Sequence, residues 1–404
     1  MKILMIPSFF RTQDDPTLGE FFFNQAKALI KLGHHVDIVY CDTYSVKYLK
    51  KYFHYREKEV EHFQGIGIYR CRKFAPLKRK SGMKGNRQVF CRGIRRLFQR
   101  YLADQEYDLI HAQCCLWGGA AARELSQVYG IPYVVTEHSS VFALHPEDIG
   151  KRDKILAKQI YEEAGQVICV SKTCQDSIHE YCKRSCIIGN AIDLDIFEEQ
   201  SLNEKDDSAG KVNIGVKSDF VFMTLCYMKN EAQLINKGIP LLLQAFGNVV
   251  QKYDDCRLYV GGGGDGEKML RHLVEEMGLS EKIVLGGALT QKEVAEQLGR
   301  CDCFVLPSRY ETFGVAYVEA MAMGKPVIAA QSGGPEYFID ESLGIIVPKD
   351  DLEKLTEAMF RMIEEYDGYD PQELKKAARE KFSLQAVGKQ LVELYQKEII
   401  KKNG

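Results

Sequence analysis

The chain has no long hydrophobic run: none of its apolar stretches approaches the roughly 18 residues that a membrane-spanning helix needs. Its opening residues, MKILMIPSFF, lack the basic region, long apolar segment and cleavage site of a signal peptide, so we expect a first strand there. The thirteen cysteines show no zinc or redox spacing, and most of them lie in apolar runs. These absences favour a cytoplasmic protein with reduced thiols that does not cross a membrane.

The chain also lacks a strong overall charge. Its net charge is -2, with 27% charged and 45% hydrophobic residues, which is typical of a globular protein. A length of 404 residues is enough for two or three domains, each with its own core. Because the average charge identifies no partner, a partner can be indicated only by local clusters of charge.

Acidic residues are absent from one long segment, residues 70–100. A solvated loop, a nucleic-acid patch and a peripheral membrane face are three interpretations of such a segment. No nucleic-acid motif accompanies it, so we expect no nucleic-acid partner. We favour contact with an anionic membrane surface, because apolar residues are interleaved with the cations. The cationic residues are Arg70, Arg72, Lys73, Lys78, Arg79, Lys80, Lys84, Arg87, Arg92, Arg95, Arg96 and Arg100.

The first half of the chain alternates strand and helix patterns. KILMIPS predicts a strand, the segment from Glu20 to Gly33 a helix, and HVDIVY the next strand. Further strands are predicted at 107–113, 132–138, 167–171 and 185–190. This order is typical of a doubly wound sheet, which places ligands outside the carboxyl ends of its strands. His138 falls at such an end and is therefore a candidate site residue, whereas Gly19 is a turn glycine or a ligand-binding glycine.

The second half begins again with a strand, FVFMTLCYM, and Lys237-Gly238 then precedes a helix. In CRLYVGGGGDGEKML, Gly261, Gly263 and Gly266 satisfy G-x-G-x-x-G, which is weak evidence for dinucleotide binding when it stands alone. The next predicted strand, KIVLGGAL, ends in glycines and lacks the acidic residue that would hold an NAD ribose. This absence disfavours a nicotinamide-dependent oxidoreductase.

Two glutamates separated by seven residues mark the segment LPSRYETFGVAYVEAMAMGKPVIAAQSGGPE, residues 306–336. Glu311 precedes a predicted helix that starts at Val315, and Glu319 lies about one turn inside it. The N–H groups and the dipole of a helix N-terminus suit a phosphate. Carboxylates on both sides of such a phosphate site fit a ligand with hydroxyls on both sides of a diphosphate. Nucleotide-sugars are such ligands.

The same segment resembles a known family. ETFGVAYVE followed by AMAMGKPVIA is similar to the E-x7-E segment of retaining GT-B glycosyltransferases of family 4, the group 1 glycosyltransferases. NAIDLDIF, residues 190–197, resembles the family's N-G-x-D-x-x-x-F, with Ala191 in place of the glycine. The resemblance implies an α/β fold of the GT-B type, in which two Rossmann-like doubly wound parallel-sheet domains face an inter-domain cleft.

The resemblance also implies domain limits. The N-terminal acceptor domain is expected over residues 1–197, a polar linker over 198–219 and the nucleotide-sugar donor domain over 220–382. Residues 383–404 are expected to form a helix that crosses back to the first domain.

The resemblance further implies roles for individual residues. Glu311 would accept hydrogen bonds from the sugar hydroxyls and support positive charge at the anomeric carbon, and Glu319 would bind the ribose. Lys237 would pair with the diphosphate. His138 would donate a hydrogen bond to the sugar. The backbone amides of Phe313, Gly314 and Val315 would bind phosphate and sugar oxygens.

Two loops complete the implied donor site. The loop containing Gly19 approaches the donor or the acceptor in the family, and the loop containing Gly263 lets backbone approach the phosphates. The chain departs from the family at Tyr227, where an arginine normally partners the lysine. Lys229 is the candidate for the second positive charge.

The function implied is transfer of a sugar, with retention of configuration, from a nucleotide-sugar to a glycan or lipid-linked acceptor in polysaccharide or glycoconjugate synthesis. UDP is the expected nucleotide, and no metal or other cofactor is expected. The enzyme would lie in the cytoplasm, at the inner face of the cell membrane. A GT-B sugar-nucleotide epimerase and a catalytically silent nucleotide-sugar binding subunit remain as alternatives, and the oligomeric state is open.

Overall fold

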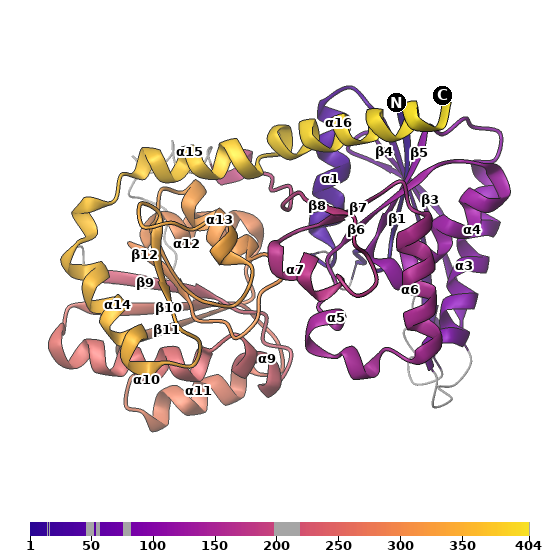
Figure 1. Ribbon diagram of the computed structural model, residues 1–404. Helices are drawn as coiled ribbons and strands as arrows, with labels where there is room; N and C mark the ends of the chain where they lie inside the picture. Colours follow the sequence, from indigo (N-terminus) through magenta and orange to yellow (C-terminus); the bar gives the residue numbers. More distant parts are fainter. Residues whose placement is uncertain are drawn as a thin grey trace. The chain divides into compact units, whose positions relative to one another are not determined.

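The chain folds into two compact α/β units (Figure 1). The computed structural model describes residues 1–13, 15, 17–45, 52–53, 57–75, 82–197 and 219–403, without the side chains of 82–85, 402 and 403. The first unit contains Met1–Ala191 and Leu384–Gly404, and the second contains Ile192–Ser383. Apart from Asp219, the expected linker 198–219 lies outside the described residues.

The first unit is built on an eight-stranded sheet with the order β3-β4-β2-β1-β5-β6-β7-β8. All neighbouring strands are parallel except β3 and β4. The central strand β1 is a continuous apolar run because both of its faces are buried. The strands are β1 (Lys2–Pro7), β2 (His35–Tyr44), β3 (Val60–Phe63), β4 (Ile66–Phe74), β5 (Leu109–Gln113), β6 (Tyr133–Glu137), β7 (Gln166–Cys169) and β8 (Ser185–Ile187).

Helices cover both faces of this sheet (Figure 1). The last of them, α16, belongs to the first unit and packs against α1, where Gly388 lies close to Ala28 and Leu32. Its Val387, Leu391 and Tyr395 are buried. The helices are α1 (Glu20–Lys31), α3 (Gly82–Tyr101), the π-helix Cys114–Gly119, α4 (Ala120–Tyr129), α5 (Val141–Leu144), α6 (Lys151–Glu163), α7 (Lys172–Ser177) and α16 (Leu384–Asn403).

The second unit repeats the architecture with a six-stranded, all-parallel sheet in the order β11-β10-β9-β12-β13-β14. Its strands are β9 (Phe220–Leu225), β10 (Cys256–Gly261), β11 (Ile283–Gly287), β12 (Cys303–Leu306), β13 (Val327–Ala330) and β14 (Gly344–Val347). Its helices are α9 (Glu231–Asn236), α10 (Ile239–Lys252), α11 (Glu267–Glu276), α12 (Gln291–Arg300), α13 (Val315–Ala322), α14 (Leu352–Glu364) and α15 (Pro371–Phe382).

The two doubly wound parallel sheets confirm the predicted fold class. The strands predicted at 107–113 and 132–138 are β5 and β6, and the helix predicted from Val315 is α13. This helix ends just before Gly324, whose φ of 74° lies in the left-handed region that glycine adopts without strain.

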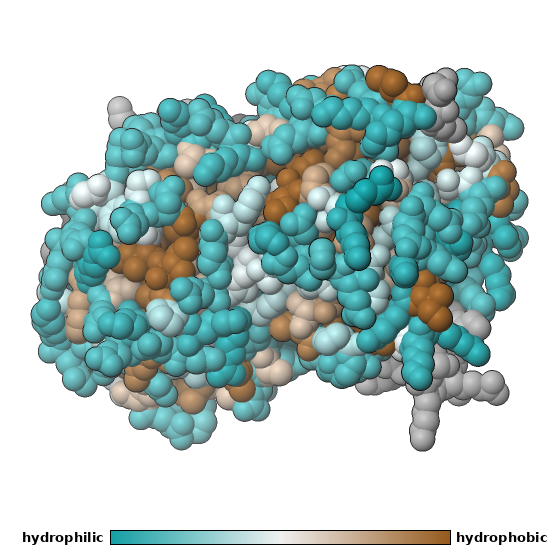
Figure 2. Space-filling model, viewed as in Figure 1, coloured by the Kyte–Doolittle hydropathy of each residue, from teal (hydrophilic) through white to brown (hydrophobic). Residues whose placement is uncertain are grey.

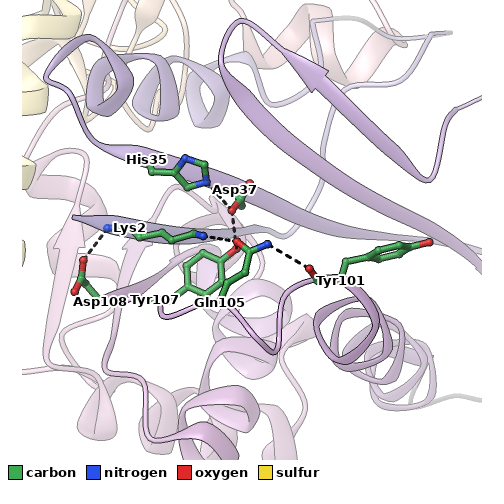
Figure 3. A network of polar contacts seen from close by, with 7 residues as sticks. All are labelled: Lys2, His35, Asp37, Tyr101, Gln105, Tyr107 and Asp108. Carbon is green, nitrogen blue, oxygen red and sulfur yellow. Dashed lines mark hydrogen bonds and ion pairs between the residues drawn. The ribbon is translucent and has the colours of Figure 1, made fainter.

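At the amino end of the first sheet, a polar network holds the buried carboxylate of Asp37 (Figure 3). The hydroxyl of Tyr107 donates to Asp37 Oδ2 over 2.6 Å, and His35 Nε2 lies 3.0 Å from the same oxygen. This network lies at the opposite end of the strands from the carboxyl ends, where ligands are expected. It is therefore part of the folded framework.

The surface shown in Figure 2 is mostly hydrophilic, with hydrophobic residues exposed in small groups. Within the described part of the chain, every helix is too short or too polar to traverse a lipid bilayer.

Candidate functional site

The N-terminus of α13 follows a left-handed glycine. Gly314 has a φ of 97°, and a Cβ atom there would lie 2.6 Å from the ring of Tyr317, so only glycine fits. The backbone N–H groups of Phe313, Gly314 and Val315 donate no hydrogen bond to any described residue. These three donors and the positive end of the helix dipole suit a phosphate oxygen. The structure thus brings the three predicted amides together.

Phe313 contributes only its backbone to this site. Its ring is 2% exposed and packs against Phe338 and Phe382, with ring centroids 5.4 Å and 5.2 Å away. This packing fixes the peptide that precedes Gly314 and so orients its N–H group.

Glu311 and Lys237 form an ion pair at the carboxyl ends of neighbouring strands. Glu311 Oε1 accepts hydrogen bonds from Lys237 Nζ at 2.6 Å and from Ser308 Oγ at 2.9 Å. Both side chains of the ion pair are mostly buried, so the contact is shielded from water. The resemblance assigned these two residues to the sugar and to the diphosphate, and the structure shows that they also hold each other.

Glu319 differs from Glu311 in having no protein partner. Its side chain is partly exposed and makes no hydrogen bond or ion pair with any described residue. Burial raises the pKa of Glu319 from 4.5 to about 7, because the ionised form loses hydration without gaining protein donors. A carboxylate in this condition can accept hydrogen bonds from ligand hydroxyls.

The glycine run after β10 packs against the loop that follows β9. Gly262 and Gly264 have φ values of 123° and 140°, and a Cβ at Gly262 would lie 1.8 Å from the carbonyl oxygen of Cys226. Met228 N donates to Gly263 O over 3.0 Å, which joins the two loops. The glycines that this packing requires are Gly262 and Gly264, which stand between the glycines of the G-x-G-x-x-G match. Gly263 lies at the contact of the two loops, and its approach to a phosphate remains a prediction.

The residues that could replace the family's arginine lie on the same loop. Tyr227 is 60% exposed, and Lys229 is exposed and makes no ion pair with any described residue. Nothing in the structure joins either side chain to Lys237. The role of Lys229 in diphosphate binding remains a prediction.

Two serines near Glu311 were missed by the sequence analysis. Ser308 donates to its carboxylate, and the carbonyl oxygen of Ser332 accepts from the backbone N–H of Glu311 over 3.1 Å. The Oγ of Ser332 is buried and has no hydrogen-bond partner among the described residues. The position of Ser308, three residues before Glu311, was the available signal, whereas Ser332 comes from the loop after β13 and gave none.

His138 lies at the end of β6 in the first unit and is buried between aromatic rings. The rings of Phe21 and Phe22 lie 4.8 Å and 5.0 Å from it. Its Nε2 is 2.8 Å from Gln113 Oε1, while Gln113 Nε2 donates to Gln25 Oε1 over 2.7 Å. The amide orientation assigns the imidazole proton to Nε2.

The protonation state of His138 bears on the hydrogen bond that it is expected to make with a ligand. Burial, reinforced by the nearby His111, lowers the pKa of His138 to about 3, while the side chain of Asn190 acts in the opposite direction. The neutral ring has its N–H committed to Gln113, and its Nδ1 is buried without a hydrogen-bond partner among the described residues. Nδ1 is the ring atom nearest to being available to a ligand, and the hydrogen bond that His138 is expected to donate to the sugar remains a prediction.

Gly19 caps the start of α1 with a φ of 74°. A Cβ there would lie 3.0 Å from the ring of Phe22 and 3.2 Å from the carbonyl oxygen of Phe9. The turn itself thus requires glycine, and a contact between Gly19 and a ligand remains a prediction.

The basic stretch is only partly a surface. Arg70 and Arg87 are buried, and they lie 3.2 Å from Glu57 and 2.7 Å from Asp153. These carboxylates lie outside the stretch in sequence and compensate two of its positive charges. Lys78, Arg79, Lys80 and the side chain of Lys84 lie outside the described residues.

The interleaved apolar residues of this stretch are also not available to a membrane. Phe90, Ile94, Leu97 and Phe98 form the buried face of α3. The opposite face of α3 is exposed and carries Arg92, Arg95, Arg96 and Arg100. An amphipathic helix packed on the sheet explains the alternation that we interpreted as a membrane face.

Two sequence profiles match the chain: "Glycosyltransferase Family 4" over residues 18–196 and "Glycosyl transferases group 1" over residues 232–381. Alpha-D-kanosaminyltransferase of Streptomyces kanamyceticus is 23% identical over 306 residues, covering 71% of this chain and 76% of the relative.

Two solved structures share the fold. Sucrose-phosphate synthase of Thermosynechococcus elongatus has a TM-score of 0.75 at 20% identity and covers 99% of this chain and 100% of its own. The Anabaena protein HepE, in complex with UDP, has a TM-score of 0.70 at 18% identity, covering 98% and 100%.

Two doubly wound units, with paired glutamates and a lysine at the strand ends of the second, define the class of GT-B glycosyltransferases. The chain belongs to glycosyltransferase family 4, the group 1 glycosyltransferases.

Proposed function

We propose that the protein is a retaining, metal-independent glycosyltransferase that moves a sugar from a UDP-sugar to a glycan or lipid-linked acceptor, in polysaccharide or glycoconjugate synthesis. One observation carries the proposal. The unpaired N–H groups at the start of α13 lie between Glu311, which pairs with Lys237, and Glu319, which has no partner among the described residues. The arrangement offers donors for a diphosphate and acceptors for hydroxyls on both sides of it.

In the proposed complex, the diphosphate binds at the N–H groups of α13 and at Lys237, which stabilise the charge on the leaving group. Competition from the diphosphate for Lys237 weakens the ion pair and leaves Glu311 able to accept hydrogen bonds from the sugar. Ser308 holds the Glu311 carboxylate in position. Glu319 accepts hydrogen bonds from the ribose hydroxyls, which supply the donors that it lacks in the protein.

His138 takes part as a hydrogen-bond acceptor. Its Nδ1 lone pair receives a hydroxyl of the transferred sugar or of the acceptor, while Gln113 holds the ring in its tautomer. In this role His138 does not act as an acid toward the substrate, and a pKa near 3 is consistent with a neutral ring.

The nucleotide is the least constrained part of the proposal. UDP is supported by the fold neighbour HepE, which is in complex with UDP. Cations at the site serve in place of a metal. The described residues that lie close enough together to share a metal ion, His145, Glu147 and Asp148, are exposed and belong to the first unit.

A thermal-shift panel of UDP-, GDP- and ADP-sugars tests the donor site. A specific donor raises the unfolding midpoint because its binding stabilises the folded state by RT ln(1 + [L]/Kd). We expect a UDP-sugar to give the largest shift, and the shift to persist in EDTA. If no nucleotide-sugar changes the midpoint, the donor-site assignment is wrong.

Three variants then separate binding from chemistry. Glu319→Ala should raise the donor KM, Glu311→Ala should chiefly lower kcat, and the exposed Glu353→Ala on α14 should change neither. Because Glu319→Ala and Glu311→Ala each remove a hydrogen bond to a charged group, we expect KM or kcat to change by about tenfold or more. Binding without transfer to any acceptor would instead identify a silent binding subunit, and conversion of a UDP-sugar to its epimer would identify an epimerase.

We also propose that the protein works in the cytoplasm, at the inner face of the cell membrane. The exposed arginines of α3 would contact anionic lipid headgroups, each contributing about 1 kcal/mol near such a surface. Because the apolar face of α3 is buried in the protein, this contact is electrostatic and should be lost at high salt.

A further inference from the structure

A basic pocket lies beside the open edge of β4 in the first unit. Its volume is about 360 Å³. The pairing of β4 with β3 stops at Tyr69, so among the described strands the last residues of β4 pair only with β2. One side of α3 forms the other wall. The lining residues are Glu57, Glu59, Arg70, Cys71, Arg72, Lys73, Gly93, Arg96, Leu97 and Arg100.

The charges of this pocket do not balance. Five basic residues and two glutamates line it, an excess of three positive charges. Both glutamates are already engaged: Glu57 lies 3.2 Å from Arg70, and Glu59 lies 3.2 Å from Arg100. These pairs leave Lys73 and Arg96 without a carboxylate among the described residues.

Lys73 and Arg96 therefore define the site, and Arg72 lines it beside them. Arg72 donates from Nη1 to the carbonyl oxygen of Tyr52 over 2.7 Å, and its guanidinium lies 4.9 Å from the centre of the Tyr52 ring. These contacts fix the direction of the Arg72 side chain. Lys73 and Arg96 make no ion pair with any described residue. An excess of fixed positive charge within a concave site raises the local concentration of anions.

The chemistry of the lining favours a phosphate over other anions. Guanidinium groups bind phosphate oxygens through paired hydrogen bonds, and a lysine adds a compact point charge. The volume admits a phosphate ester of small-molecule size. We propose that this pocket binds a phosphoryl group through Arg72, Lys73 and Arg96, as part of a lipid headgroup or as free phosphate. The proposal concerns the first unit and does not depend on the donor chemistry proposed for the second.

The alkylation rate of Cys71 reports whether an anion occupies the pocket. Cys71 lines the pocket and is partly exposed, and its hydrogen bond with Cys41, together with the nearby Lys73, lowers the pKa of its thiol. Cys186 is also partly exposed, whereas the other eleven cysteines are buried. It lies on β8, outside the pocket, and serves as an internal control for alkylation.

The test measures the alkylation rates of Cys71 and Cys186 by mass spectrometry, with inorganic phosphate or chloride at equal ionic strength. We expect saturating phosphate to slow modification of Cys71 by about tenfold and to leave Cys186 unchanged. Parallel reactions use vesicles of phosphatidylglycerol with phosphatidylcholine, or of phosphatidylcholine alone. Protection by anionic vesicles identifies a lipid headgroup, and protection by phosphate alone identifies a free anion.

Variants connect the protection to the pocket. The Lys73→Gln/Arg96→Gln double variant should lose it, while the control Arg152→Gln, which removes an exposed charge on α6 outside the pocket, should keep it. Glu59→Gln removes a competing negative charge and should strengthen the protection of Cys71. Equal protection of both cysteines, equal loss in the control, or no protection under any condition would overturn the proposal.

Discussion

At the scale of single residues, the proposed function reduces the stability of the protein mainly at Glu319. Its carboxyl is partly buried on α13 and lacks a protein donor, so its ionised form is poorly stabilised. A site that binds hydroxyls must leave acceptors unsatisfied in the free protein. We therefore expect a substitution of Glu319 to increase the stability of the protein and to weaken donor binding.

Glu319→Gln should stabilise the protein in alkaline solution. The pKa of Glu319 is raised from 4.5 to about 7, so its contribution to stability is fully present below pH 4.5 and is lost as the pH rises through 7. At about pH 8.5 we expect the variant to gain about 2 kcal/mol, less than the full shift implies because the side chain is partly exposed. Urea unfolding at several pH values measures this difference.

The same urea series contains its own check. Well below pH 4.5, Glu319 is neutral in both the folded and unfolded states, so the variant and the parent should have equal stability. A gain that is independent of pH would show that packing, and not ionisation, is responsible.

In contrast to Glu319, Asp37 is a buried carboxylate that accepts hydrogen bonds from protein groups. Tyr107→Phe removes the hydroxyl that lies 2.6 Å from it and should cost about 1–3 kcal/mol, because a buried charge loses a hydrogen bond. Tyr101→Phe is the matched control, since the ring of Tyr101 points away from the network (Figure 3). A comparison of thermal midpoints in which both variants behave alike would exclude the hydroxyl as the cause.

At the scale of elements, the candidate donor site of the second unit depends on turns that admit only glycine. Gly238 follows Lys237 at the start of α10, with a φ of 68°, and a Cβ there would lie 2.0 Å from the carbonyl oxygen of Pro307. This close approach brings the loop that carries Lys237 against the strand end that precedes Ser308 and Glu311. The packing of backbone on backbone therefore sets the geometry of the ion pair.

Gly238→Ala should cost about 3 kcal/mol or more and should also raise the donor KM, because the Lys237 loop must move. Gly278→Ala is a control with the same φ of 68° but no atom within 4 Å of the added Cβ. It should cost about 1 kcal/mol, the strain of a left-handed alanine alone. Denaturant unfolding of both variants measures the difference, and equal losses would mean that the contact with Pro307 has no effect.

Much of this element-level structure could be predicted. Apolar strands followed by glycine-bearing loops gave β5, β6 and the start of α13, because a buried parallel strand must be apolar along its whole length. The amphipathic pattern of α3 was visible as well. The error was to assign its apolar face to a membrane, since periodicity shows that a face is buried but not what covers it.

At the scale of the whole molecule, the chain begins and ends in the same unit. Tyr395 of α16 places its hydroxyl 2.7 Å from His111 Nδ1, and His111 Nε2 lies 2.7 Å from Thr136 Oγ1. Burial lowers the pKa of His111 to about 3, so the ring is neutral, accepts from Tyr395 and donates to Thr136. The last helix is thus joined to the core of the first unit.

Tyr395→Phe should therefore destabilise the first unit by about 1–2 kcal/mol, because a buried imidazole nitrogen is left without its donor. Ile400→Ala on the same helix is the control: its side chain is 70% exposed, and the change should stay within about 0.5 kcal/mol. Hydrogen exchange of β5 and α1 locates the effect. Unchanged exchange there would show that the bond to His111 does not support the core.

The sequence alone determined the two doubly wound sheets, the position of α13 and the candidate residues at its start. These features depend on local pattern, on glycine positions and on a motif that is continuous along the chain. The two glutamates could be identified because they lie on one segment, with the turn at Gly314 between them.

Only the tertiary structure decided the states and partners of these residues. Lys237 and Glu311 are 74 positions apart, and their ion pair forms because neighbouring parallel strands bring their carboxyl ends together. The pKa of Glu319 and the tautomer of His138 depend on burial and on partners from several elements. Compensation of the basic stretch comes from carboxylates outside it. Such contacts between distant segments leave no local pattern, because only packing creates them.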